Sequence, residues 1–140
     1  MKPALLDVNV LLALAWPNHQ HHALAHAWFG TDARFGWATC AFTELGFIRL
    51  SSNPAYTAAA VSPQEAAQLL AALAVHKKHR FLNSPFARDT SIYAKTLGHQ
   101  QVNDAYLVRL AETGRARLVT FDTRLSGHAR GVETVFVILA

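Results

Sequence analysis

The chain has 140 residues, 51% of them hydrophobic, and a formal net charge of +4. This composition fits one compact domain, residues 1–140, whose core needs neither a disulfide nor a structural metal. The single cysteine, Cys40, excludes an intramolecular disulfide and favours a reducing compartment, so we expect a cytoplasmic protein. The basic balance favours polyanionic partners. A membrane span is excluded because Asp7 and Asn9 interrupt the short apolar run near the N-terminus.

The chain begins with an apolar run, Ala4–Leu6, that predicts a short buried strand. Asp7 follows it, and helix-forming residues then continue through Val10–Leu14. An acid at the carboxyl end of a parallel strand points into the crevice where such sheets bind ligands. The alternative is that Asp7 only caps the helix.

A second helix is expected over His21–Phe29, closed by Gly30. His22 and His26 are four residues apart, a spacing that places both on one face of the helix. The sequence leaves two interpretations of this histidine group open, a metal site and a polar helix face. Its members are His19, His21, His22 and His26.

Strands and helices alternate through the rest of the chain. The expected elements are a strand 34–38, a helix 41–51, a helix from 66 to about 76 opened by the capping box Ser62–Glu65, a strand 80–82, a helix 88–97, a helix 102–112, a strand 116–119 and a strand 134–139. Helices that separate apolar strands predict the α/β class, with a mostly parallel sheet covered by helices on both faces.

Four acids stand out within this pattern. Asp7 and Asp122 end predicted strands, while Glu44 and Asp104 lie in the first turns of helices, on their apolar sides. Strand ends and helix starts lie at one rim of a parallel sheet, so we expect all four to meet in one crevice. The other five acids are explained as loop, cap or exposed helix residues: Asp32, Glu65, Asp89, Glu112 and Glu133.

Such a cluster requires something to relieve its repulsion. Two carboxylates about 4 Å apart repel by roughly 4 kcal/mol at an effective dielectric constant near 20. Raised pKa values or a bound divalent cation relieve this repulsion, and ligand sets made only of oxygen favour Mg²⁺, with Mn²⁺ as a substitute, over zinc. The predicted chemistry is hydrolysis of a phosphodiester by a metal-activated water.

Polar neighbours complete the predicted site. Asn9 and Thr120 each stand two residues from a candidate acid, where they would orient a carboxylate or contact the substrate. The alternative is that they are ordinary cap and turn residues. Arg49, Arg109 and Arg124 lie near candidate acids in the sequence, and we expect them to position phosphate, Arg124 as part of the substrate site.

Four stretches, LLDVNVLLAL, TELGFIRL, VNDAYLVRLAE and LVTFDTRL, occur in this order. Together they resemble the PIN domain family, specifically its VapC-type ribonuclease toxins of type II toxin–antitoxin systems. The resemblance covers essentially the whole chain and implies a three-layer α/β/α domain with a small, mostly parallel sheet. It also implies Mg²⁺-dependent cleavage of RNA, with Asp7, Glu44 and Asp104 as the principal metal ligands, Asp122 as a fourth acid and Thr120 helping to organise the site.

The same resemblance implies partners. These are an RNA substrate, a small VapB-type antitoxin protein and a second copy of the chain in a homodimer.

Two other functions compete with a metal-dependent endoribonuclease. A catalytically silent PIN-like module would bind RNA or protein without cleaving it, but such a module has no reason to keep clustered charges. A phosphatase with a strand-end Asp nucleophile is the other. In this chain Asp7 is followed by Val8 and Asn9 rather than by a second Asp.

Overall fold

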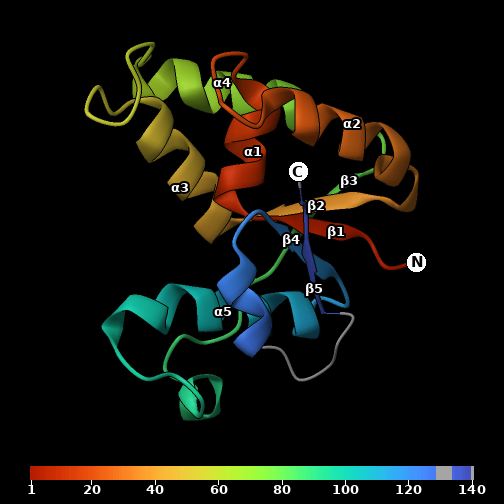
Figure 1. Ribbon diagram of the computed structural model, residues 1–140, viewed down its shortest axis with the longest axis vertical. Helices are drawn as coiled ribbons and strands as arrows, with labels where there is room; N and C mark the ends of the chain where they lie inside the picture. The colour runs from red at the N-terminus through yellow and green to blue at the C-terminus, as the bar shows by residue number, and fades with distance from the viewer. Residues whose placement is uncertain (129–133, 140) are drawn as a thin grey trace.

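A single sheet of five parallel strands forms the centre of the protein in a computed structural model, which describes residues 1–128 and 134–139 (Figure 1). The spatial order is β3-β2-β1-β4-β5. The strands are β1 (Ala4–Leu6), β2 (Trp37–Cys40), β3 (His79–Leu82), β4 (Arg117–Thr120) and β5 (Val135–Val137). β1 lies in the middle and pairs with β2 on one side and β4 on the other.

Helices cover both faces of this sheet (Figure 1). One layer is made of α1 (Val8–Ala15), α2 (His22–Asp32), α3 (Ala41–Ser51) and α4 (Pro63–Ala74). The other contains α5 (Val102–Thr113) and two 3₁₀ turns, η2 (Thr90–Tyr93) and η4 (Thr123–His128). Two shorter 3₁₀ turns are η1 (Ala33–Phe35) and η3 (His99–Gln101). The predicted three-layer α/β/α fold is therefore confirmed.

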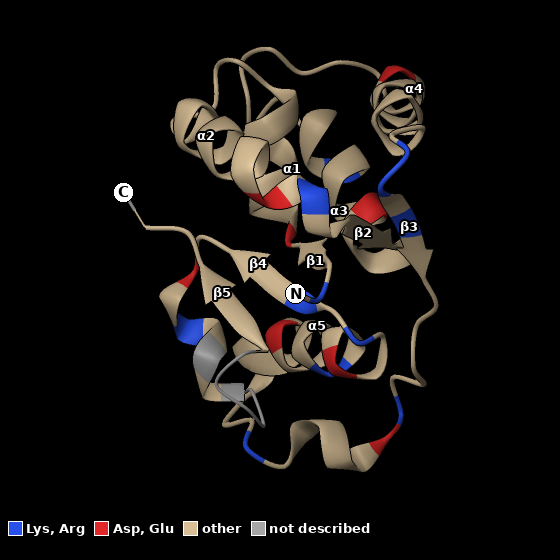
Figure 2. Ribbon diagram, turned by 90° about the vertical axis from the view of Figure 1, so that its right-hand side faces the viewer, with Lys and Arg blue, Asp and Glu red and all other residues tan. Residues whose placement is uncertain are grey.

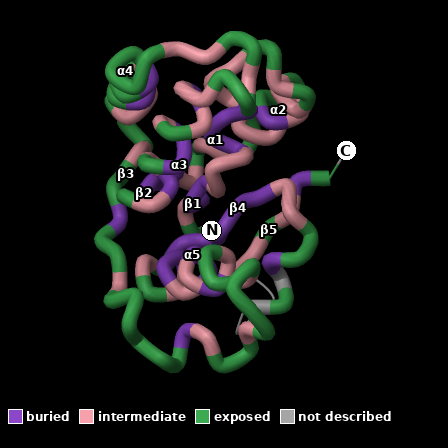
Figure 3. The backbone as a smooth tube through the Cα atoms, turned by 90° about the vertical axis from the view of Figure 1, so that its left-hand side faces the viewer, coloured by how far each residue is buried: buried purple, intermediate pink, exposed green. Residues whose placement is uncertain are grey.

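The alternation of side chains along each strand divides the core in two. In β1, Ala4 and Leu6 pack with α1, α3 and α4, whereas Leu5 points to the opposite face and packs with α5. Every residue of β1, β2 and β4 is buried (Figure 3). Burial on both faces is why these strands have almost uninterrupted apolar sequences.

Two predicted elements differ from the structure. The strand expected over 34–38 starts only at Trp37, because Ala33–Phe35 forms a 3₁₀ turn and Gly36 leaves it with a φ of +91°. The helix expected over 88–97 is reduced to η2. There Asp89 is extended and caps the turn, since its carboxylate accepts hydrogen bonds from the backbone and hydroxyl of Ser91, so the turn begins only at Thr90.

The histidine group on α2 has a structural role. Ring nitrogens of His22 and His26 lie 2.7 Å and 2.9 Å from the carbonyl oxygens of Ala13 and Leu14, in the last turn of α1. These carbonyls have no partner within their own helix. The two rings therefore cap α1 and join it to α2, and they form the polar helix face of the second interpretation. α2 itself continues past Gly30 to Asp32.

None of the helices in the described part of the chain has the length and apolar character that a bilayer crossing requires.

The close approach of α3 to α1 depends on Gly46. A Cβ atom at this position would lie 2.7 Å from a methyl carbon of Val8, the residue that follows Asp7. We expect Gly46→Ala to lower the free energy of unfolding by about 1–3 kcal/mol, because overpacking must displace one helix from the other. Urea denaturation measures this.

Gly30→Ala is the matched control, because nothing lies within 4 Å of the added Cβ in α2. It should raise stability by up to about 1 kcal/mol through helix propensity alone. A Gly46→Ala variant as stable as the unmodified protein would show that the contact between α1 and α3 is not tight.

Candidate functional site

Asp7 stands where β1 becomes α1, and its two carboxylate oxygens have different partners. Oδ1 accepts a hydrogen bond of 2.7 Å from the backbone N–H of Val8, as a helix cap. Oδ2 accepts one of 2.7 Å from the hydroxyl of Thr120, at the end of β4. Asp7 is thus both a cap and a member of a polar cluster, so the two interpretations of the sequence do not exclude each other.

Thr120 is the centre of this cluster. Its fully buried hydroxyl donates to Asp7 and accepts from the side-chain amide of Asn9 at 3.3 Å and from the backbone N–H of Asp122 at 3.0 Å. The oxygen of the Asn9 amide accepts from the backbone N–H of Phe121 at 3.4 Å. These bonds join the carboxyl ends of β1 and β4, and they orient the carboxylate of Asp7.

Burial raises the pKa of Asp7, and the charges of Asp104 and Asp122 raise it further. The hydrogen bonds from Thr120 and Val8 act in the opposite direction without cancelling this effect. The negative charge of the ionised Asp7 carboxylate is therefore unfavourable in the folded protein, and a positive charge nearby would stabilise it.

A pocket of about 370 Å³ opens between α1, α3 and the start of α5, and both Asp7 and Asp104 line it. Asn103 and Arg49 lie on its wall, together with apolar residues of α3. The pocket thus combines two acids, an amide and a guanidinium, which are groups that suit a cation and a phosphate. Lys and Arg are otherwise spread over both layers of the protein rather than gathered on one face (Figure 2).

Glu44 does not join this pocket. Phe42, Gly46 and Arg49 face the pocket at helical spacing, and a residue two positions after Phe42 lies on another face of α3. The Glu44 carboxylate instead accepts a hydrogen bond of 2.6 Å from Thr39 on β2. The expected convergence of four acids is therefore not what this structure has.

His79 completes the surroundings of Glu44. Its Nε2 atom lies 2.8 Å from the same Thr39 hydroxyl. Burial lowers the pKa of His79, against the raising effect of the Glu44 charge, so the ring is mostly neutral at pH 7. Glu44 is thus held by the Thr39 hydroxyl, and the mostly neutral His79 ring bonds to that hydroxyl rather than to the carboxylate.

Asp122 follows β4 and is near enough to Asp7 to act on its pKa. Its carboxylate is occupied by Arg124, whose Nε and a terminal nitrogen donate at 3.0 Å and 2.8 Å. These bonds hold the pKa of Asp122 below its usual range. Arg124, which we expect to contact substrate, forms an ion pair with a candidate acid. Its side chain is nevertheless 82% exposed.

Among the side chains that the structure describes, no three of His, Cys, Asp or Glu come together closely enough to hold one metal ion. Neither the histidine group nor the four candidate acids therefore supplies three ligands for one ion. Asp7 and Asp104 remain the two candidate acids that share a pocket.

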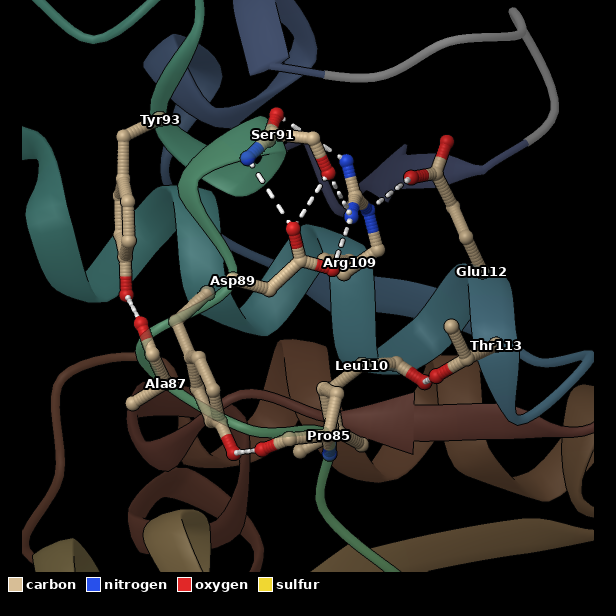
Figure 4. Close-up of polar contacts among 10 residues, drawn as sticks. Pro85, Ala87, Asp89, Ser91, Tyr93, Arg109, Leu110, Glu112 and Thr113 are labelled. Carbon is tan, nitrogen blue, oxygen red and sulfur yellow. Dashed lines mark hydrogen bonds and ion pairs between the residues drawn. The ribbon is translucent and has the colours of Figure 1, made fainter.

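Arg109 lies outside the site, on the far side of α5 from the acid pocket. It donates to the hydroxyl and carbonyl of Ser91 and makes an ion pair with Asp89, which ties η2 to α5 (Figure 4). Glu112 lies 3.9 Å from its Nε. Arg109 is thus a structural cation rather than a phosphate ligand.

The remaining acids have structural partners where they are described. Asp32, expected in an ordinary loop, forms an ion pair with the buried Arg117. The hydroxyl of Ser62 caps α4 by accepting from the backbone N–H of Glu65, which is the Ser62 half of the predicted capping box, and it donates to the Glu65 carboxylate. Glu133 lies outside the described residues.

Three residues near the candidate acids were not predicted from the sequence. Asn103 directly precedes Asp104, and its polar side chain at a helix start was the available signal. Thr39 stands near a strand end, like Thr120, and the same rule would have found it. No local signal marks His79, because parallel pairing of β3 with β2 brings it to Thr39.

Comparison with known proteins assigns a family to this arrangement. The model of the PIN domain family matches residues 4–131. Ribonuclease VapC38 of Mycobacterium tuberculosis (strain ATCC 25618 / H37Rv) is 45% identical over 119 residues, which are 85% of this chain and 84% of that protein. Ribonuclease VapC39 of the same strain is 41% identical over 133 residues, with 90% and 93% covered. Ribonuclease VapC44 is 40% identical over 126 residues, with 88% of each covered.

The raised pKa of Asp7 predicts a pH-dependent difference between the protein and Asp7→Asn. A folded-state pKa above the unfolded value means that the stability of the native state is greatest below the unfolded pKa of about 3.8 and is lost as the pH rises through the folded value. Asparagine caps helices as well as aspartate does. In EDTA at pH 7, we therefore expect the variant to unfold at a higher temperature than the unmodified protein.

The difference should shrink as the pH falls toward 4, and differential scanning calorimetry across this range measures it. A variant that is less stable at pH 7, or a difference that does not change with pH, would contradict the unfavourable charge at Asp7.

Proposed function

The chain belongs to the PIN domain family, among its VapC-type ribonucleases, and on this basis we propose that it is a metal-dependent endoribonuclease, the toxin of a VapBC-type toxin–antitoxin module. The observation that carries this proposal is the pocket shared by Asp7 and Asp104, in which burial and neighbouring acids make the charge of Asp7 unfavourable. RNA is the proposed substrate, and the net charge of +4 suits a polyanion.

We propose Mg²⁺, with Mn²⁺ as a substitute, as the cofactor. The donors in the pocket fit a hard cation, because they are carboxylate and amide oxygens, and Mg²⁺ typically binds through one or two carboxylates together with substrate phosphate. Asp7 and Asp104 would hold the ion. When bound, it would stabilise the negative charge that develops on the phosphate oxygens during hydrolysis.

The residues of the chain have distinct parts in this proposal. Thr120 and Asn9 fix the orientation of Asp7 through the hydrogen bonds described above. Arg49, on the pocket wall, is placed to bind the phosphate next to the scissile bond. Asp122 and Arg124 hold each other at the rim, and we propose that Arg124 contacts RNA from there. Glu44 joins α3 to β2 beside the site, through its hydrogen bond with Thr39.

The partners follow from the family. We propose a small VapB-type antitoxin that neutralises the toxin, a homodimer as the assembled form, and the cytoplasm as the location. The alternative function is a catalytically silent PIN-like module that binds RNA or protein. The pair of acids in one pocket favours the enzyme, since a silent site gains nothing from the unfavourable charge at Asp7.

The direct test is cleavage of total cellular RNA by the purified, antitoxin-free protein. We expect discrete fragments in Mg²⁺ and none in EDTA. Asp104→Asn keeps the shape of the side chain and removes its charge, so it should lower the cleavage rate at least about 100-fold. Glu65→Gln, which changes an exposed acid of the α4 cap, should cleave like the unmodified protein. No cleavage by the folded protein, together with tight RNA binding, would favour the silent module.

Metal binding has a test that does not depend on activity. Because a ligand that binds only the folded state stabilises it, Mg²⁺ at a hundredfold excess over its Kd should add about 2.7 kcal/mol to the free energy of unfolding. Thermal unfolding with Mg²⁺ and with EDTA measures this. Asp7→Asn should respond much less, and Glu65→Gln should respond fully. An equal response of Asp7→Asn and the unmodified protein would remove Asp7 from the metal site.

A further inference from the structure

We propose that a second pocket, beside the acid pocket, binds an unpaired base of the RNA substrate next to the scissile phosphate. This base pocket has a volume of about 340 Å³ and lies between the start of α3, the start of α5 and the segment 84–93. Its walls are mainly aromatic and aliphatic, with two polar side chains. The residues that matter are Phe42, Tyr93, Val102 and Tyr106, with Ser84 and Asn103.

The base pocket adjoins the acid pocket. Phe42 and Asn103 line both, so the two spaces share a wall. A nucleotide whose phosphate lies beside Asp7 and Asp104 therefore has an adjoining space for its base. The inference rests on the proposed function, because it takes the acid pocket as the place where RNA is cut.

The two tyrosine rings are held by hydrogen bonds at their hydroxyl groups. The hydroxyl of Tyr93 donates to the carbonyl of Ala87 (Figure 4) and that of Tyr106 to the carbonyl of Pro85, each at 2.6 Å. Both polar ends are thus bonded to the same loop. The rings of Phe42 and Tyr106 are tilted by 50° with centroids 6.2 Å apart, so they do not cover each other face to face.

The segment that carries Tyr93 is anchored before any ligand arrives. Arg109 on α5 donates to the hydroxyl and carbonyl of Ser91, and Asp89 accepts from the Ser91 hydroxyl and also pairs with Arg109 (Figure 4). The wall formed by Tyr93 is therefore fixed against α5. A preformed wall lowers the entropy that binding would otherwise lose.

The chemistry of this pocket suits a base better than a peptide side chain. Single-stranded bases are commonly bound by stacking on aromatic rings and by hydrogen bonds to their edges, and Asn103 and Ser84 supply donors and acceptors. At the rim, the Arg88 guanidinium lies 4.4 Å from the centre of the exposed Phe86 ring. A cation in this position suits the phosphate of a flanking nucleotide.

The test compares two fluorescein-labelled RNAs of about ten nucleotides, one of adenosines and one abasic throughout, which carry equal phosphate charge. Binding is measured by anisotropy in EDTA at low salt, so no cleavage is needed. We expect the unmodified protein to bind the base-bearing RNA roughly tenfold more tightly than the abasic RNA, the size of effect that base–aromatic stacking gives. Tyr93→Ala and Tyr106→Ala should lose this preference.

The controls separate stacking from folding. Tyr93→Phe and Tyr106→Phe keep the rings and lose only the hydroxyl bonds, so they should keep the preference. Tyr56→Ala removes an exposed tyrosine outside the pocket and should keep it as well. Circular dichroism identifies folded variants, and Tyr93→Ala carries the test where Tyr106→Ala does not fold.

Three results would overturn the base pocket. The first is equal affinity for the two RNAs, the second is a preference that both folded Ala variants retain, and the third is no measurable binding of the base-bearing RNA. Each can occur whether or not Mg²⁺-dependent cleavage is found. Loss of cleavage alone would instead overturn the proposed enzyme.

Discussion

The carboxylate of Asp7 is held at the junction of β1 and α1 by a backbone N–H and by the buried hydroxyl of Thr120. Because Thr120 ends β4, this one hydrogen bond joins the carboxyl ends of the two central strands. The same burial that fixes the carboxylate raises its pKa, and Asp104 and Asp122 add to this. Stability and function are thus opposed at this point, since the charge that suits a cation is unfavourable in the folded chain without one.

Helix α3 separates two polar environments. Its face with Phe42, Gly46 and Arg49 borders the acid pocket, while Glu44 turns to Thr39 and His79. Gly46 allows α3 to approach α1 closely enough for the first face to form a wall beside Asp7. The position of one small residue therefore controls both the packing of two helices and the shape of the candidate site.

The segment between β3 and α5 links stability to recognition in a different way. It forms little regular structure, yet the hydroxyl of Tyr106 and the ion pair of Arg109 with Asp89 attach it to α5, and the hydroxyl of Tyr93 bonds to Ala87 within it. An irregular segment can present side chains at angles that a helix does not offer, and its anchors fix those angles. This explains how a segment whose regular structure is two short 3₁₀ turns can form a wall of a defined pocket beside the acids.

The sequence by itself determined the fold class and the elements with strong patterns: the apolar strands, the Ser62 cap of α4 and the helices 41–51 and 102–112, the second of which ends one residue later in the structure. These are local properties, set by periodicity and capping. It also placed Asp7 and Asp104 at a strand end and a helix start, which lie at the same rim of a parallel sheet.

Only the tertiary structure decided which of the four acids line the same pocket. Glu44 does lie on a buried stripe with Phe47, but that stripe packs toward α1 and α4 rather than toward α5. Likewise, the partners of Arg109 and Asp32 were not deducible, because Asp89 and Arg117 meet them only through the packing of segments that are distant in the sequence. Asp122 and Arg124 are only two residues apart, but their sequence spacing alone does not decide whether Arg124 binds this acid or a substrate.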